Sequence, residues 1–257
     1  MTRIDSYEDL TDNIVGWLKD YYWMYNVKAF VVGVSGGIDS AVVSSLCART
    51  GLPTYVVCMP LESKFENTKL SDAHSRALVE KYDNVKRIEV ELFSAYDSLI
   101  KSIEWWSEAQ HFNKKEFTSS EHAKANTKSR MRMVTLYQIA GSVGGIVVGT
   151  GNKVEDYGVG FYTKYGDGGV DIAPIADLYK TEVWELGEYL EVDQRIVDAD
   201  PTDGLWIDSR SDEEQLGASY AELEEAMETG TGPAVDVLKK FNEQNKHKML
   251  PIPTFKL

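Results

Sequence analysis

The sequence has few cysteines and no long apolar run. Its two cysteines, Cys47 and Cys58, each lie in an apolar segment and lack the paired spacing of disulfide frameworks or zinc sites. They predict buried thiols in a reducing compartment. No stretch approaches membrane-spanning length, and no apolar run follows a basic start at the N-terminus as in a secretory signal. We therefore expect a cytoplasmic protein that does not enter a membrane.

Basic residues are also scarce, with 27 Lys and Arg against 41 Asp and Glu and a formal net charge of -14. Such a surface repels nucleic acid, so non-specific DNA or RNA binding is not expected. An anionic small molecule remains compatible if the basic residues are gathered in one place. The composition, 43% hydrophobic and 26% charged without an internal break, favours one globular domain over residues 1–257.

Apolar periodicity predicts alternating strands and helices. We expect helices over 7–27, 40–49, 68–82, 123–143, 178–190, 220–228 and 233–246, and strands over 29–34, 54–59, 85–92 and 145–149. Repeated strand-helix-strand units indicate an α/β fold with a doubly wound, mainly parallel sheet and helices on both faces. Residues 105–121 are polar and aperiodic and predict a mobile loop, while 158–169 predict a glycine-rich loop. A ligand site is expected beyond the carboxyl ends of the strands.

Residues 35–40 read Ser-Gly-Gly-Ile-Asp-Ser and stand where the first strand ends and a helix begins. Glycines allow a tight turn there, and free N–H groups at a helix N-terminus attract anions. The segment lacks the lysine of the kinase and GTPase phosphate loop and does not fit GxGxxG. It predicts a phosphate cradle, and an ordinary glycine turn with a serine cap is the alternative.

The same six residues resemble the SGGxDS pyrophosphate loop of the N-type ATP pyrophosphatases. Further segments are similar, in the expected order, to the ammonia-dependent NAD synthetases of that superfamily, over nearly the whole chain. They are 125–133, 149–155, 161–169, 174–180, 201–203 and 246–248. The resemblance implies an ATP-dependent ligase that adenylates the nicotinate carboxylate of deamido-NAD and lets ammonia displace AMP. It also implies a homodimer, and a tail over 246–257 that closes on the substrate, in the family from the neighbouring subunit.

The resemblance implies three sets of site residues. The catalytic set is Asp39, Glu155, Lys180 and Asp167, with Asp39 and Glu155 holding Mg²⁺ and Asp167 placed to hold ammonium. The ATP-binding set is Gly33, Ser35, Gly36, Gly37, Ile38, Asp39, Ser40, Thr150, Lys180 and Thr202, with Thr150 also reaching deamido-NAD. The deamido-NAD-binding set is Tyr21, Asn126, Arg130, Tyr137, Lys164, Asp167, His247 and Lys248.

The roles of the stripe residues and of Glu155 can also be argued from the residues themselves. At 100° per residue, Asn126, Arg130 and Tyr137 fall on one stripe of a helix, so three polar groups point the same way. Glu155 follows a strand whose end opens on the expected site, and carboxylate oxygens suit Mg²⁺. A solvated arginine, a half-buried tyrosine and a surface glutamate remain the alternatives, and a solvated tail remains one for His247 and Lys248.

The chain departs from the family pattern in three places. Cys58 stands before Met59-Pro60 where some members have an arginine, so one ATP contact must be made otherwise. His122 stands where an aromatic residue often stacks on nicotinate, and the turn after Glu155 is one residue longer than usual. Another ATP pyrophosphatase, GMP-synthetase-like or tRNA-thiolating, and a non-catalytic nucleotide-binding module are the alternative functions.

Overall fold

The computed structural model describes residues 3–61, 65–109, 120–201 and 211–256. Its central sheet has the strand order β3-β2-β1-β4, and all three neighbouring pairs are parallel. The strands are β1 (Phe30–Gly33), β2 (Thr54–Cys58), β3 (Val85–Glu89) and β4 (Ile146–Val148). The chain thus builds outward from β1 to β3 and then crosses to the other side of β1. In such a sheet the ligand crevice lies at this reversal, between the carboxyl ends of β1 and β4.

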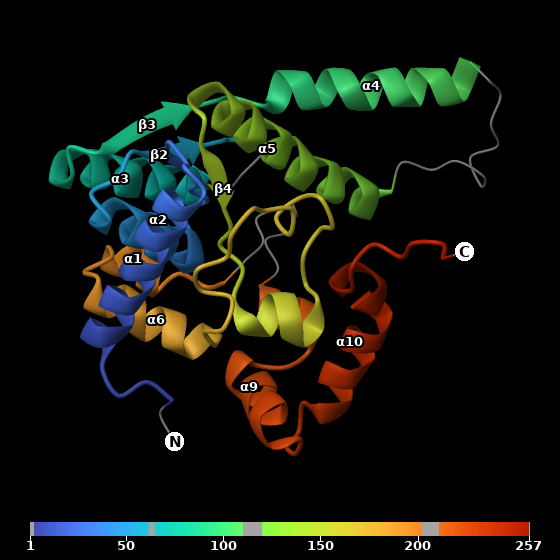
Figure 1. The fold of residues 1–257 in the computed structure, drawn as a ribbon. Helices are drawn as coiled ribbons and strands as arrows, with labels where there is room; N and C mark the ends of the chain where they lie inside the picture. Colours follow the sequence, from blue (N-terminus) through green and yellow to red (C-terminus); the bar gives the residue numbers. More distant parts are fainter. Residues whose placement is uncertain (1–2, 62–64, 110–119, 202–210, 257) are drawn as a thin grey trace.

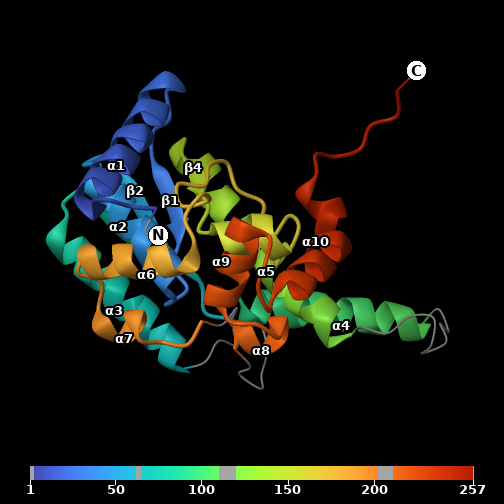
Figure 2. The ribbon, with the colours of Figure 1, turned by 90° about the horizontal axis from the view of Figure 1, so that it is seen from below.

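Helices cover both faces of the sheet, which confirms the expected fold class (Figures 1 and 2). One face carries α1 (Tyr7–Met24), α2 (Ile38–Arg49), α3 (Phe65–Lys81) and α6 (Lys180–Tyr189), followed by the short α7 (Gln194–Val197). The other face carries α4 (Phe93–Ala109) and α5 (Glu121–Val143). Side chains of β1 alternate between them, because Phe30 and Val32 join the first core and Val31 joins the second.

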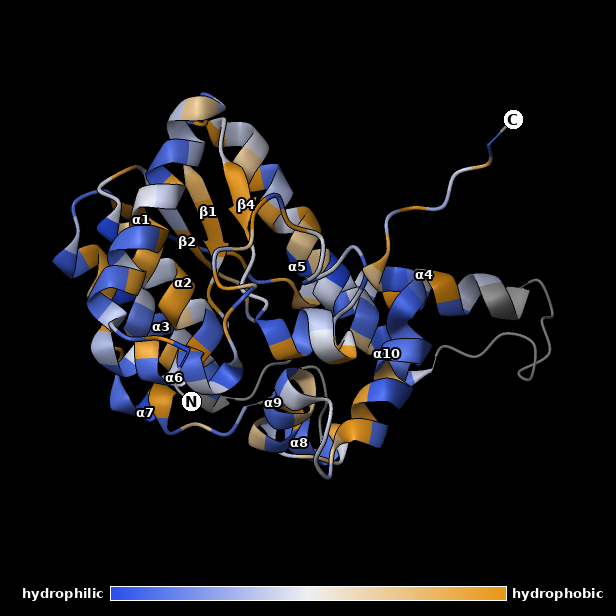
Figure 3. Cartoon of the chain, turned by 60° about the horizontal axis from the view of Figure 1, so that its bottom comes forward, coloured by the Kyte–Doolittle hydropathy of each residue, from blue (hydrophilic) through white to orange (hydrophobic). Residues whose placement is uncertain are grey.

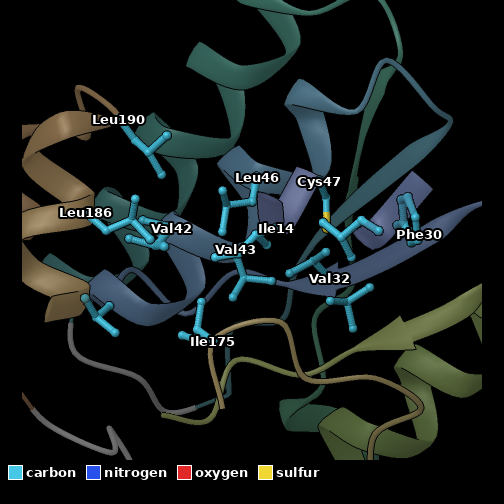
Figure 4. Packing of buried hydrophobic residues seen from close by; sticks show 14 of the residues in the cluster. Ile14, Phe30, Val32, Val42, Val43, Leu46, Cys47, Ile175, Leu186 and Leu190 are labelled. Carbon is cyan, nitrogen blue, oxygen red and sulfur yellow. The ribbon is translucent and has the colours of Figure 1, made fainter. Parts of the chain in front are cut away.

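The first core fixes α2 and α6 against β1. Val42, Val43 and Leu46 of α2 pack between Phe30 of the strand and Leu186 of α6 (Figure 4). The hydropathy colouring shows the same layering, with apolar β1 and β4 behind more polar helices (Figure 3). Gly187 allows the close approach of α6, because a Cβ there would lie 2.5 Å from Ile38 Cδ1. The last turn of α6 is therefore packed closely against the first turn of α2.

The C-terminal part forms a third core beside the sheet. It consists of a π-helical turn, η1 (Lys153–Val159), and the helices α8 (Asp212–Leu216), α9 (Tyr220–Thr229) and α10 (Val235–Met249). Residues after α10 run away from the body of the protein (Figure 2). Among the described residues, no helix is both long and apolar enough to cross a membrane.

The structure changes some of the expected boundaries. Helix α2 begins at Ile38 instead of Ser40, because Gly37 already has the extended conformation of an N-cap. Residues 105–109 are the last turns of α4 and not part of a loop, since Tyr96 and Ile100 anchor that helix against α5 and it continues beyond them. Residues 110–119 of the predicted loop lie outside the described residues, and Ser120 and Glu121 are the N-cap and the first residue of α5. Of the expected glycine-rich loop, Gly158 and Val159 belong to η1.

Candidate active site

The turn between β1 and α2 forms one wall of a cavity of about 600 Å³. Gly36 has a φ of +93°, and a Cβ there would lie 2.4 Å from the carbonyl oxygen of Asn67, so only glycine fits. Gly37 caps α2 without a side-chain hydrogen bond, while Ser35 Oγ accepts a bond from its N–H at 3.2 Å. The positive end of α2 is thus placed at the cavity wall. This is the arrangement that binds phosphate.

Lys180 links this turn to the chain that follows β4. It is the first residue of α6, and its side chain is 3% exposed. Its Nζ donates to Asp39 Oδ2 at 2.5 Å and to Glu155 Oε1 at 2.9 Å. Three of the four residues predicted to be catalytic therefore meet at one point, although Asp39 and Lys180 are 141 positions apart.

Two further residues fix the carboxylates. Asn152 is fully buried, and its Nδ2 donates to Asp39 Oδ1 at 3.1 Å. Its Oδ1 accepts from the N–H groups of Val154 and Glu155, both at 3.1 Å, and so caps η1. The hydroxyl of Tyr220, on α9, donates to Glu155 Oε1 at 2.7 Å. Each carboxylate is therefore held from two directions.

The cluster is buried, and its charges shift one another. Burial would lower the pKa of Lys180, but the carboxylates of Asp39 and Glu155 raise it, so this ammonium stays charged. Burial raises the pKa of Asp39 and Glu155 adds to the effect, against the opposing charge of Lys180. Burial acts in the same direction on Glu155, but Lys180 and the Tyr220 hydroxyl outweigh it and lower the pKa.

Asp39 and Glu155 are the residues that fit a magnesium ion. Both offer carboxylate oxygen, the hard ligand that Mg²⁺ prefers, and together with the charged Lys180 the three groups carry one net negative charge. Within the described residues no three His, Cys, Asp or Glu side chains are grouped to hold a metal ion. A Mg²⁺ ion held by these two carboxylates would take its other oxygens from water and substrate phosphates.

Asp167 and Thr150 line the same cavity as the turn between β1 and α2 and the cluster of Lys180, Asp39 and Glu155, here called the lysine cluster. The carboxylate of Asp167 accepts bonds from Ser129 Oγ at 2.5 Å and from the N–H of Thr163 at 3.1 Å. Enclosure by the surrounding protein raises its pKa, although the residue keeps an open surface within the cavity. A carboxylate is thus fixed in the wall of the cavity, on the segment that follows η1.

The polar stripe of α5 faces the segment that carries Asp167. Asn126 Oδ1 accepts from Thr163 Oγ1 at 2.6 Å, and Arg130 Nε donates to the carbonyl of Lys164 at 3.1 Å. Tyr137 donates its hydroxyl to Asp171 Oδ1 at 3.0 Å. The three side chains therefore point the same way, as the helical spacing predicts, but they bond to the loop over 163–171 and do not line the cavity.

The end of α10 meets the same loop within one chain. Lys248 Nζ donates to the carbonyl of Tyr162 at 2.6 Å, and the Tyr162 hydroxyl donates to the carbonyl of Lys248 at 2.7 Å. Lys164 Nζ lies 3.5 Å from the carbonyl of His247. Lys164, His247 and Lys248 are thus gathered at one place beside the cavity, and none of them lines it.

One expected binding residue lies far from this site, and another cannot be placed. Tyr21 lies on α1, across the sheet from α5, and packs on Tyr25 with ring centroids 4.5 Å apart. Thr202 lies outside the described residues. His122, which departs from the family pattern, is exposed at the start of α5.

Sequence reasoning did not find three residues that hold the site together. Ser129 stands one helical turn from Asn126 and Met133 on α5, so the same spacing could have indicated it. Asn152 lies inside a segment that resembled the family but carried no separate signal. Tyr220 comes 65 residues after Glu155, and nothing local to it points to the site.

Comparisons with known proteins point in one direction. Residues 10–253 match the family model described as NAD synthase. An NH(3)-dependent NAD(+) synthetase of Carboxydothermus hydrogenoformans is 35% identical over 246 residues, which cover 95% of each chain. One of Archaeoglobus fulgidus is 36% identical over 224 residues, 86% of this chain and 83% of that one.

Solved structures show the same relationship. The NMN synthetase from Francisella tularensis superposes with a TM-score of 0.85 at 31% identity, over 99% of this chain and 100% of the other. The NH3-dependent NAD synthetase from Campylobacter jejuni gives a TM-score of 0.76 at 25% identity, over 98% and 100%.

Proposed function

The chain belongs to the NAD synthase family, and we propose that it amidates deamido-NAD with ammonia at the expense of ATP, giving NAD, AMP and pyrophosphate. The observation that carries this proposal is the position of Lys180. Its ammonium joins Asp39 of the phosphate turn to Glu155 after β4, in the same cavity as Asp167. The half of the site that would bind the ATP phosphates, at the turn after β1, is thus beside the half that carries Asp167. A reaction between two nucleotides requires such proximity.

The reaction needs activation because a carboxylate is a poor acceptor for ammonia. In the proposed sequence a nicotinate oxygen attacks the α-phosphorus of ATP, and the bond from that phosphorus to the bridging oxygen breaks. Pyrophosphate leaves and the carboxylate becomes an acyl adenylate. Ammonia then attacks the acyl carbon, AMP departs with the former carboxylate oxygen, and one proton is lost from the nitrogen.

The residues of the phosphate half stabilise the charge that grows on the leaving pyrophosphate. The N-terminus of α2 presents its dipole and N–H groups, and the Lys180 ammonium adds a buried positive charge. Because Lys180 is held by two carboxylates and packs over the Tyr220 ring at 5.2 Å, it needs little rearrangement to act. Asp39 and Glu155 would hold Mg²⁺, which supplies further positive charge to the phosphates when bound.

Asp167 is proposed to act on the ammonia side. Its carboxylate is fixed by Ser129 and Thr163, and the raised pKa makes it a better proton acceptor than an ordinary aspartate. It can hold an ammonium ion by charge and accept one of the two protons that this ion loses on becoming the amide nitrogen. No side chain has to form a covalent intermediate.

We propose a homodimer for the complete binding site. Tyr21 lies on the face of the sheet opposite α5, so within one chain it cannot share a substrate with Arg130. A second copy could supply such a residue, as the family resemblance implies. Cytoplasmic location belongs to the same proposal, since ATP and a reducing environment for Cys47 and Cys58 are available there.

A mononucleotide substrate is the second candidate. It is favoured by the superposition on an NMN synthetase at a TM-score of 0.85. The same chemistry would then convert nicotinate mononucleotide into its amide. The phosphate half of the site would serve both reactions equally.

The test supplies the protein with Mg²⁺, ATP and ammonium together with either deamido-NAD or nicotinate mononucleotide. The proposal predicts NAD, AMP and pyrophosphate in equal amounts, with a higher kcat/KM for the dinucleotide and with ammonium preferred over glutamine. A higher kcat/KM for the mononucleotide would replace it with the second candidate. ATP cleavage with neither amide formed would remove both.

A further inference from the structure

Arg87 of β3 lies in the same cavity as Lys180, although neither the motif nor the lysine cluster includes it. The cavity follows the carboxyl edge of the sheet, from Thr150 after β4, past the turn after β1 and Cys58 at the end of β2, to Arg87 and Glu89 on β3. Neighbouring strands are about 4.8 Å apart, which puts β3 roughly 10 Å from β1.

This spacing indicates which part of ATP reaches β3, given the proposed function. In the proposed function the phosphates lie at the turn after β1, and the acceptor carboxylate lies near Asp167, on the segment that follows β4 and η1. The nucleoside half must therefore extend the other way, across β2 and toward β3. Arg87 is a positively charged side chain at that end, and it is 19% exposed.

The guanidinium of Arg87 is held in one orientation. Its Nε donates to Ser75 Oγ at 3.0 Å, and its Nη2 donates to Asp72 Oδ1 at 2.7 Å and contacts Glu89. Ser75 Oγ in turn lies 3.3 Å from Cys58 Sγ. The Nη1 group makes no hydrogen bond within the described part of the chain. A fixed fork with an unused pair of donors is suited to a planar acceptor.

We propose that Arg87 binds the nucleoside half of ATP, with Nη1 donating to the base or the ribose, and that Asp72 is the positioning residue. Cys58, at the end of β2, stands where some members of the family have an arginine. Arg87 lies on the neighbouring strand, β3, and supplies the guanidinium in this chain.

A purely structural role, in which Arg87 only ties β3 to α3, makes a different prediction. Arg76 provides the matched control because it also lines the cavity and bonds to both oxygens of Asp72, at 3.0 and 2.9 Å, but its side chain is 62% exposed. If the ion pairs with Asp72 were all that mattered, both arginines would affect stability and neither would affect nucleotide binding selectively.

Calorimetric titration with Mg²⁺ and ATP alone tests the proposal, beside titration with Mg²⁺ and pyrophosphate. Arg87→Gln should weaken ATP binding by about tenfold or more, the size expected for a lost hydrogen bond from a charged group, and leave pyrophosphate binding within about twofold. Arg76→Gln should leave both unchanged within the same margin. Melting curves establish that each variant is folded.

Arg87→Lys keeps the charge but loses the fork, so it should also weaken ATP binding selectively, and it serves if the glutamine variant does not fold. Unchanged ATP affinity in both Arg87 variants would overturn the inference. So would equal losses for ATP and pyrophosphate, or an equal loss in Arg76→Gln. Selective loss in a chain that forms no amide would leave the inference standing and remove only the proposed function.

Discussion

The side-chain amide of Asn152 donates to Asp39 Oδ1 at 3.1 Å, across 113 positions of sequence. The same side chain caps η1 through the N–H groups of Val154 and Glu155. One buried residue therefore sets the positions of both carboxylates that face Lys180. The relative placement of the two halves of the site depends on it.

Asn152→Ala should reduce kcat/KM by about 10- to 100-fold, because a hydrogen bond to a charged group and the helix cap are both lost. Steady-state assays with ATP varied measure this effect. Asn242→Ala is the control, since Asn242 also donates to the π-helical turn, at the carbonyl of Gly158 at 3.0 Å, but does not touch Asp39 or Glu155. Equal losses in both variants would show that Asn152 acts only on the stability of η1.

Tyr220→Phe removes one hydroxyl from Glu155 and keeps the ring over Lys180. We expect kcat to fall by about tenfold, because Glu155 loses one of the two groups that orient Oε1. Tyr7→Phe is matched to it: the Tyr7 hydroxyl donates to Glu185 at 2.6 Å, outside the cavity. An unchanged kcat in Tyr220→Phe would mean that Lys180 alone positions Glu155.

Gly36→Ala should abolish binding of Mg²⁺ and ATP, because the residue has a φ of +93° and the new Cβ would lie 2.4 Å from the carbonyl oxygen of Asn67. Gly51→Ala separates the effect of the positive φ from the effect of the steric clash. Gly51 also has a positive φ, +72°, but a Cβ added there would have no atom within 4 Å of it. That variant should cost about 1–2 kcal/mol of unfolding free energy and leave ATP affinity unchanged. Normal ATP binding by Gly36→Ala would contradict the geometry of the turn.

His74 makes the stability of the protein depend on pH. It is 6% exposed, and its Nε2 lies 3.0 Å from Ser44 Oγ on α2. Burial lowers its pKa from 6.5 to about 4, against the opposing effects of the Ala41 backbone and the charge of Asp193. Between these values the unfolded chain binds the proton more tightly, so stability is full above pH 6.5 and falls as the pH drops toward 4.

At pH 5 this single group should remove about 2 kcal/mol of unfolding free energy relative to neutral pH. Urea denaturation of the protein and of His74→Gln at pH 7.5 and pH 5 measures the difference between them. His122→Gln, at an exposed position on α5, is the control and should keep the dependence of the unaltered protein. The contribution of His74 is refuted if His74→Gln loses as much stability as the unaltered protein.

Local signals were sufficient for the parts of the fold that depend on neighbouring residues. The run from Phe30 to Gly33 and the glycines after it predicted a strand, a turn and a helix, since each property acts within a few positions. The stripe of Asn126, Arg130 and Tyr137 was found for the same reason, and all three do face one loop.

Other features depend on contacts distant in sequence. Residues 105–121 as a whole appeared polar and aperiodic, but the first five of them continue α4, which Tyr96 and Ile100 anchor against α5. The role of Tyr220 needs α9 to pack beside η1, and that follows from the third core and not from any pattern near residue 220. The π-helical turn likewise depends on Asn152, whose cap satisfies two N–H groups at once.

We propose that the protein activates the nicotinate carboxylate by joining it to the α-phosphate of ATP with loss of pyrophosphate. Every later step depends on this one. Deamido-NAD with ¹⁸O in its nicotinate carboxylate tests it directly, with ammonium, Mg²⁺ and unlabelled ATP and with mass spectrometry of the products. We expect one ¹⁸O atom in AMP and none in pyrophosphate. Unlabelled AMP alongside newly formed NAD would contradict the proposed activation.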